Sequence, residues 1–355
     1  MRRRIVLAIA AAGFVAAAVV FPRGESTQRP APAVTIAQQP LPARLSDSAF
    51  VQLIERISEP GGYFDTDNLI SNESSYLHVI GRIRDLGIQG GVFVGVGPDQ
   101  NFSYIAAVRP RIAFILDIRR DNLLQHLWFK ALFEQSPTRI EFLCRMFGRI
   151  PPPQPEAWRD RSIQDLIDYI DRSTHDAATF ARSGMDLRYT SHGRPPRPGY
   201  PTYRQLLLET DRAGQQANYL VTEEAYAFLR ELHLRNLIVP VTGDFAGTHA
   251  LREIGAYVRE RGERLTTFYA SNVEFYLMQD RSFDRFADNV AARPANPDGV
   301  IIRSLFGRIY EHPQAMPGYN STQLLQRIGT FIDESRAGAY ISYGDLVYRG
   351  YIDLR

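Results

Sequence analysis

The most constraining feature of the chain is the segment from Gly91 to Asp121, GVFVGVGPDQNFSYIAAVRPRIAFILDIRRD. Two apolar runs, Gly91 to Val96 and Ile112 to Leu116, flank a glycine-rich turn and a short helical or irregular piece. Long runs of β-branched and aromatic residues predict strands that are covered on both faces, as in a parallel sheet. The segment therefore predicts two neighbouring parallel strands with a crossover between them.

Glycines and an acid stand at the ends of these two strands. Gly95 and Gly97 form a Gly-x-Gly turn, followed by Pro98 and Asp99, which lets the backbone turn tightly close to a ligand. Asp117 ends the second strand about 20 residues after Gly97, a spacing typical of the acid that accepts hydrogen bonds from ribose hydroxyls. The alternative is that the glycines only make a tight turn and that Asp117 only caps a helix.

Strands and helices alternate again in the second half of the chain. The block from about 135 to 235 reads as helices, and we interpret it as an insertion that caps the sheet. Beyond it the sequence predicts helices at 281–292 and 322–334 and strands at 236–242, 265–270, 299–304, 339–343 and 348–354. This alternation predicts a Rossmann-like α/β fold with a doubly wound, mostly parallel sheet.

Polar residues follow several of the predicted strands. Ligands of such sheets bind at the carboxyl ends of the strands. We therefore expect the segment from Gly95 to Asp99, Asp117, Asp244 and the segment from Ser271 to Glu274 to meet in one crevice for a small-molecule ligand.

The polar segment 63–73, YFDTDNLISNE, precedes this unit. We expect a loop that lies over the ligand, although a turn followed by a helix cap has the same composition. Asp65 and Asp67 could instead hold a divalent metal, but their spacing lacks the glycine and the closing glutamate of a calcium loop. The sequence therefore predicts no metal site.

The amino terminus differs in character from the rest. Arginines at positions 2–4 precede an uncharged apolar run, so residues 1–21 are predicted to be a signal peptide or membrane anchor. Residues 22–45 are rich in Pro, Ala and Gln and predict a flexible linker, followed by a domain over 46–355. The arginines predict that this domain is exported to the periplasmic side, and it would be cytoplasmic if the start is assigned too early.

Composition excludes several classes of protein. The net charge of +2 gives no electrostatic reason to expect nucleic acid as the main partner. Cys144 is the single cysteine and Lys130 the single lysine, which argues against a cysteine-rich metal site and against Schiff-base chemistry. The chain has no GxSxG, HExxH or GxxxxGK motif.

In the residues named above, over about 75–125 and 236–345, the chain resembles the class I S-adenosylmethionine-dependent methyltransferases. The resemblance implies that Gly95 and Gly97 turn beneath S-adenosylmethionine, that Asp117 binds its ribose and that Asp244 contacts its adenine amino group. Asp99 takes the place of the family's third glycine, where an acid would crowd the carboxylate end of the cofactor.

The resemblance also implies roles for the residues after the third and fourth strands. Phe245 would contact the cofactor beside Asp244, and Ser271 would lie with it at the tip of the fourth strand, over the reacting methyl group. Asn272 and Glu274 are the catalytic candidates, and His249 is a further candidate base. The whole chain also resembles a bacterial protein family that carries the segments FDTDNLISNE, VGVGPDQNFSY and SNVEFYL, which by itself indicates no reaction.

Several functions are consistent with these observations. The first is an S-adenosylmethionine-dependent methyltransferase-like protein acting on a small or envelope-associated substrate. The second is a non-catalytic, membrane-tethered or exported ligand-binding protein on the same fold. A metal-dependent nucleotide-sugar enzyme using Asp65 and Asp67, and an NAD-dependent dehydrogenase, remain as further alternatives.

Overall fold

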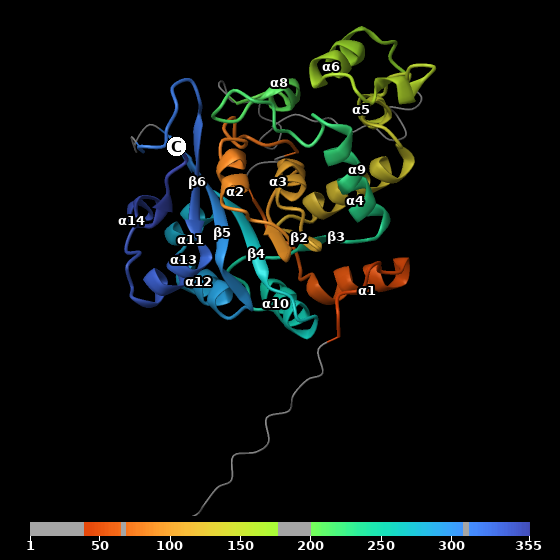
Figure 1. Cartoon of the computed structure of the whole chain (residues 1–355). Coiled ribbons are helices and arrows are strands. Elements are labelled where there is room, and N and C mark those ends of the chain that lie inside the picture. The colour runs from red at the N-terminus through yellow and green to blue at the C-terminus, as the bar shows by residue number, and fades with distance from the viewer. Residues whose placement is uncertain (1–38, 65–68, 177–199, 308–311) are drawn as a thin grey trace, which may run out of the picture. The chain divides into compact units, whose positions relative to one another are not determined.

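The computed structural model describes residues 39–64, 69–176, 200–307 and 312–355 (Figure 1). The chain divides into two compact units, Met1–Ile36 and Ala37–Arg355, and all the described residues belong to the second. The predicted signal peptide or anchor at 1–21 lies outside the described residues, as do Asp65 and Asp67. Within the described ranges, no helix has both the length and the apolar character needed to cross a bilayer.

The described residues form a seven-stranded sheet with the strand order β3-β2-β1-β4-β5-β6-β7. Neighbouring strands from β3 to β5 pair in parallel, whereas β6 is antiparallel to β5 and β7 is antiparallel to β6. The strands are β1 (Val92–Gly95), β2 (Ile112–Asp117), β3 (Ile238–Thr242), β4 (Leu265–Ser271), β5 (Ala295–Phe306), β6 (Ser321–Arg327) and β7 (Tyr351–Ile352). The predicted α/β class with a mostly parallel, Rossmann-like sheet is confirmed.

The central strands are buried along their whole length. All residues of β1, β2 and β3 are buried, as their unbroken apolar sequences predict. The chain runs outward from β1 to β2 and β3 and then returns to β4 on the other side of β1. This reversal of direction between β1 and β4 is the point at which open α/β sheets bind ligands.

Helices cover both faces of the sheet. On one face α4 (Arg120–Gln135) contacts β2 and β3, and α9 (Glu223–Leu234) packs on α4 and on α3 (Gln100–Val108), beside α2 (Ile80–Asp85). The other face carries α1 (Asp47–Ile57), α10 (Ala250–Glu260), α12 (Phe283–Ala291) and α13 (Ile328–Arg336). The side chain of Ser46 caps α1.

Short helices fill the block between β2 and β3. They are α5 (Arg139–Phe147), a 3-10 helix η1 (Pro155–Trp158), α6 (Ile163–Arg172) and α8 (Tyr203–Leu208). Figure 1 shows α6 and α8 well away from α10 and α12. Thr138, Ser162 and Thr202 begin α5, α6 and α8 with capping boxes, which satisfy the first free N–H groups of each helix. Two more short helices, α11 (Val273–Gln279) and α14 (Tyr343–Tyr348), flank β4 and β7 in sequence.

The predictions for the last part of the chain were wrong in two places. The first half of the predicted helix at 322–334 is strand β6, and only its second half belongs to α13. The predicted strand at 339–343 does not form, because Ser342 caps α14 and Ile341 is 91% exposed. The expected edge strand near the carboxyl terminus is β7.

The end of the predicted linker also differs from expectation. Leu41 and Leu45 are buried in the hydrophobic core. The backbone N–H of Leu45 donates to the carbonyl of Arg235 at 3.1 Å, and that of Gln39 donates to Glu260 at 3.0 Å. The two buried leucines and these backbone hydrogen bonds attach residues 39–45 to the domain.

Candidate active-site cavity

A cavity of about 340 Å³ lies at the carboxyl ends of β1, β2, β3 and β4. Its size is within the range of small-molecule sites, roughly 300–1,000 Å³. Of the polar strand tips predicted to converge, Gly97, Asp117, Asp244, Ser271 and Asn272 meet here, whereas Gly95, Asp99 and Glu274 do not line the cavity. The cavity lining includes Tyr63, Phe64, Ser71, Asn72, Gly97, Gln100, Leu116, Asp117, Ile118, Arg119, Asp244, Phe245, Ser271, Asn272, Tyr276, Leu277 and Arg285.

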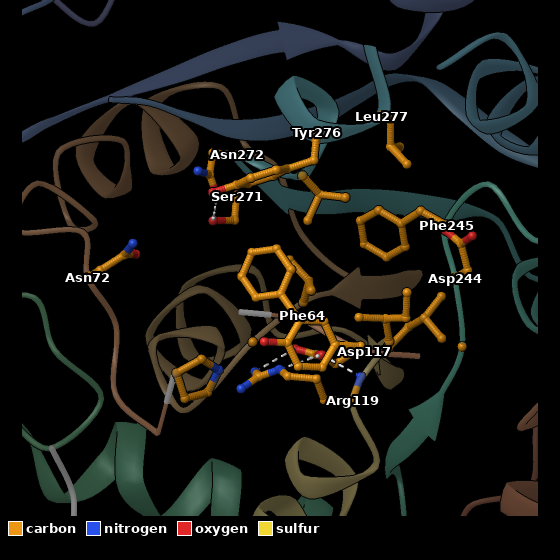
Figure 2. A pocket seen from close by; sticks show the side chains of 18 of the residues that line it. Phe64, Asn72, Asp117, Arg119, Asp244, Phe245, Ser271, Asn272, Tyr276 and Leu277 are labelled. Atoms are coloured by element: carbon orange, nitrogen blue, oxygen red, sulfur yellow. Dashed lines mark hydrogen bonds and ion pairs between the residues drawn. The ribbon is translucent and has the colours of Figure 1, made fainter. Parts of the chain in front are cut away.

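The segment before α2 forms one side of this cavity. Figure 2 shows Phe64 between the Asp117–Arg119 pair and the Ser271–Asn272 pair. The ring of Phe64 meets that of Tyr276 edge to face, with 5.1 Å between centroids. The N–H of Gly62 donates to the carbonyl of Ile118 at 2.8 Å, which ties this segment to the tip of β2.

The two glycines of the first turn have different roles. Gly97 lines the cavity with a φ of 81°, a left-handed conformation that favours glycine. Gly95 does not line the cavity, and a Cβ there would lie 2.0 Å from Asn101 Oδ1 and 2.6 Å from the Phe93 ring. Gly95 is therefore required by packing within its own turn rather than by a ligand.

Asp99 was predicted to contact the cofactor, but it points away from the cavity. Its buried carboxylate accepts hydrogen bonds from the hydroxyls of Tyr203 and, at 3.3 Å, Tyr219, both in the block between β2 and β3. Burial raises the pKa of Asp99 to about 6. Asp99 therefore anchors the block between β2 and β3 and does not crowd the cavity.

Asp117 lines the cavity at the tip of β2, as predicted, and forms a close pair with Arg119. The backbone N–H and the Nε of Arg119 donate to Asp117 Oδ1 at 2.9 and 3.1 Å. Nη2 of Arg119 donates to Oδ2 at 3.1 Å (Figure 2). The sequence did not predict this pairing, which offsets the charge of the carboxylate.

Asp244 and Phe245 follow β3 and line the cavity. Asp244 Oδ1 accepts the N–H of Ala246 at 2.9 Å, in a local turn. The Phe245 ring stacks on Phe286, with 5.7 Å between centroids, so that it contributes both to the core and to the cavity wall. Leu116, Ile118 and Phe245 add apolar side chains to a cavity lining that also contains Asp117 and Asp244.

The two catalytic candidates after β4 have different positions. Asn272 lines the cavity beside Ser271 (Figure 2). Glu274 does not: its carboxylate is fully buried and accepts hydrogen bonds from Arg303 Nε at 2.7 Å and Nη2 at 3.1 Å. The prediction that Glu274 is a catalytic base was therefore wrong, because this side chain pairs with the buried Arg303. His249 is absent from the lining and contacts the carbonyl of Arg56 at 2.9 Å.

Sequence reasoning missed the residue that lies behind this part of the cavity, Glu73. Its carboxylate is fully buried and accepts a hydrogen bond from the hydroxyl of Ser271. The only signal was the density of polar residues in the segment 63–73. Among the described residues, no group of three His, Cys, Asp or Glu side chains is arranged to hold a metal ion.

Comparison with known proteins gives a family. A family model described as "Domain of unknown function (DUF7790)" matches residues 68–332, about three quarters of the chain. The chain belongs to this family. The matched DUF7790 region contains β1 to β6 and every cavity-lining residue except Tyr63 and Phe64. The cavity is therefore built almost entirely from the DUF7790 domain.

Two further comparisons add little to the family match. Among solved structures, the chain is similar to an rRNA methyltransferase, aviRa, from Streptomyces viridochromogenes, at 12% identity and a TM-score of 0.31. The similarity covers 77% of this chain and 96% of that one, but a TM-score this low carries no argument about the chain. No curated protein matches the sequence.

Proposed function

We propose that this DUF7790 protein is an S-adenosylmethionine-dependent methyltransferase-like protein that acts on a small or envelope-associated substrate. One observation carries the proposal: Asp117 and Asp244, at the tips of the adjacent strands β2 and β3, line the same cavity together with apolar side chains. Such an arrangement suits an adenosine group, because one carboxylate can accept hydrogen bonds from the ribose hydroxyls and the other can accept one from the exocyclic amine.

The residues of the cavity fit this cofactor. Gly97 leaves space beside the turn, and Ile118 and Phe245 offer apolar contact for a purine ring. Asp99, whose charge would oppose the carboxylate end of the cofactor, faces Tyr203 instead. Arg285 is exposed at the cavity and its Nε donates to the carbonyl of Ala246 at 3.2 Å.

The chemistry of methyl transfer demands little of the protein. S-adenosylmethionine supplies an already activated methyl group when it is bound. The chain would contribute orientation and exclusion of water, which can account for a large share of the rate acceleration. Asn272, Tyr276 and Phe64 lie where they would orient a second ligand against the first.

A second candidate function is a non-catalytic ligand-binding protein, exported or tethered to a membrane through residues 1–21. Two observations favour it. Arg119 already pairs with Asp117, and Glu274 is engaged by Arg303 rather than facing the cavity. The location of the domain, periplasmic or cytoplasmic, forms part of each proposal, since a methyltransferase needs the cytoplasmic supply of its cofactor.

Calorimetric titration of the full chain with S-adenosylmethionine, S-adenosylhomocysteine and NAD tests the proposal. We expect micromolar binding of the first two ligands and a loss of at least tenfold in Asp117→Asn, which keeps the shape of the side chain. Asp85→Asn, an exposed acid at the end of α2, is the matched control and should bind as the natural chain does. Binding of NAD alone would favour a dehydrogenase, and binding of none of the three would overturn the proposal.

A further inference from the structure

Glu73 is a fully buried carboxylate surrounded by hydrogen-bond donors. Its Oε1 accepts the hydroxyl of Tyr269 at 2.8 Å and the hydroxyl of Ser271. Its Oε2 accepts Nε2 of Gln323 at 2.5 Å. The backbone close to Glu73 is held by β6, because the N–H of Ser75 donates to the Ser321 hydroxyl at 3.3 Å. The position of the carboxylate is therefore well defined.

This carboxylate has no cationic partner among the described residues. Arg303 of β5, the register partner of Ser271, is bound to Glu274 instead. The groups acting on Glu73 are hydrogen-bond donors only, and burial raises its pKa above the ordinary value. A buried carboxylate without a cationic partner costs stability, and ionisable groups of this kind cluster at functional sites.

Ser271 connects Glu73 to the cavity. It ends β4 and lines the cavity, and its hydroxyl donates a hydrogen bond to Glu73. Its φ of 52° lies in the left-handed region, which is uncommon for a residue other than glycine, and the β4–β5 register shifts between Tyr269 and Ser271. Irregularities of this kind re-aim side chains and gather at functional sites. Here the irregularity places one hydroxyl between the cavity and the buried carboxylate.

A second link runs from the cavity to the same carboxylate. Gln100 also lines the cavity, and its Nε2 donates to the hydroxyl of Tyr269 at 3.1 Å. Tyr269 in turn donates to Glu73. Glu73, Tyr269 and Gln323 themselves are absent from the cavity lining, so the cavity reaches the carboxylate only through Ser271 and Gln100.

We infer that Ser271 and Glu73 form the proton acceptor of the cavity, and that the substrate is a molecule whose reacting hydroxyl or amine must lose a proton. This inference rests on the proposed function and names its substrate class. The proton of the substrate O–H or N–H passes to Ser271 Oγ while the proton of Ser271 passes to Glu73 Oε1. The substrate atom keeps the electron pair, and Glu73 becomes a neutral acid.

The groups that face Glu73 allow its titration to be observed separately. The phenols of Tyr104 from α3 and Tyr269 from β4 are the titratable groups that interact with it, and burial holds the pKa of each well above the usual range. The facing side chains of β5 and β6, Ser304 and Gln323, do not titrate. As the pH rises, Glu73 is therefore the first group of this cluster to change charge.

The test compares equilibrium affinities for two probes, S-adenosylhomocysteine and sinefungin, in which an ammonium group stands at the position of the sulfonium methyl. If the negative charge of Glu73 stabilises a positive charge at that position, the full chain should bind sinefungin about tenfold more tightly than S-adenosylhomocysteine. A tenfold ratio of affinities is the scale of a hydrogen bond to a charged group. The preference should be lost in Glu73→Gln and reduced in Ser271→Ala. It should also fall as the pH drops through the pKa of Glu73, and be independent of pH in Glu73→Gln.

The outcomes separate the two proposals. Equal binding of the two probes by every variant would leave the proposed function intact and overturn the proton acceptor. Binding of neither probe by the natural chain would overturn the proposed function together with the inference that depends on it. Glu55→Gln, which removes an exposed carboxylate on α1, is the matched control and should keep the preference. If Glu73→Gln does not fold, Ser271→Ala still tests the inference, because this variant keeps the buried carboxylate.

Discussion

Arg119 holds Asp117 through both carboxylate oxygens, with two side-chain contacts of 3.1 Å at the tip of β2. Both side chains are almost completely buried, with 10% of Arg119 and 6% of Asp117 exposed. The acid expected to bind ribose is therefore also the acceptor for a neighbouring guanidinium, so a substitution there affects stability as well as binding.

Asp117→Ala should accordingly destabilise the protein, by about 3 kcal/mol, because it removes the acceptor to which both Nε and Nη2 of the buried Arg119 donate. Urea unfolding of the single variant and of Asp117→Ala/Arg119→Met measures this contribution. The double variant should recover a large part of the loss, since it leaves no buried charge unmatched. Equal stability of natural chain and single variant would contradict the importance of the pair.

Glu274→Gln should destabilise the protein by about 3–5 kcal/mol, since it breaks a fully buried ion pair with Arg303. Ligand affinity, measured at a temperature where the variant is folded, should change less than twofold because Glu274 does not line the cavity. The double variant Glu274→Leu/Arg303→Met separates the ion pair from packing. A loss of affinity without a loss of stability would return Glu274 to the list of catalytic candidates.

Asp99 should make stability depend on pH. Burial raises its pKa to about 6 from 3.8, so between these values the folded state binds more protons than the unfolded state. This contribution is fully present below about pH 4 and is lost as the pH rises through 6, a change of about 3 kcal/mol. His126 opposes it, because burial lowers its pKa to about 4 and its contribution is lost as the pH falls below 6.5.

Comparison of Asp99→Asn with the natural chain separates the pH-dependent stability contribution of Asp99 from that of His126. The asparagine oxygen can still accept from Tyr203, so the variant should gain about 2–3 kcal/mol relative to the natural chain between pH 4 and pH 7.5. Urea unfolding at both pH values measures the difference. A stability difference that is the same at both would show that Asp99 does not titrate in this range.

Phe64→Ala should weaken binding of S-adenosylmethionine about tenfold, since it removes an aromatic contact of the order of 1 kcal/mol together with buried apolar area. The melting temperature should change by less than about 2 °C, because Phe64 is only half-buried. Ile341→Ala, at an exposed position far along the chain from the cavity lining, is the control. Unchanged affinity would mean that Phe64 does not cover the bound ligand.

The failed helix prediction at 322–334 has its physical origin in the buried polar residues of β6. Strand β6, STQLLQR, does not alternate polar and apolar residues, and Gln323 and Gln326 within it are buried. They are buried because Gln323 donates to Glu73 and Gln326 accepts from Arg303. A polar residue that satisfies a buried charge from elsewhere in the chain cannot be distinguished, from sequence, from one on an exposed helix face.

The sequence alone determined the central sheet and the place of the cavity. Unbroken β-branched runs predict strands covered on both faces, and the carboxyl ends of parallel strands necessarily share one edge, so that Asp117, Asp244 and Ser271 come together. Only the tertiary structure decided where Asp99, Glu274 and Glu73 point. Their partners Tyr203, Arg303 and Gln323 lie between about 30 and 250 residues away in sequence, and burial of a carboxylate depends on which donors the fold brings to it.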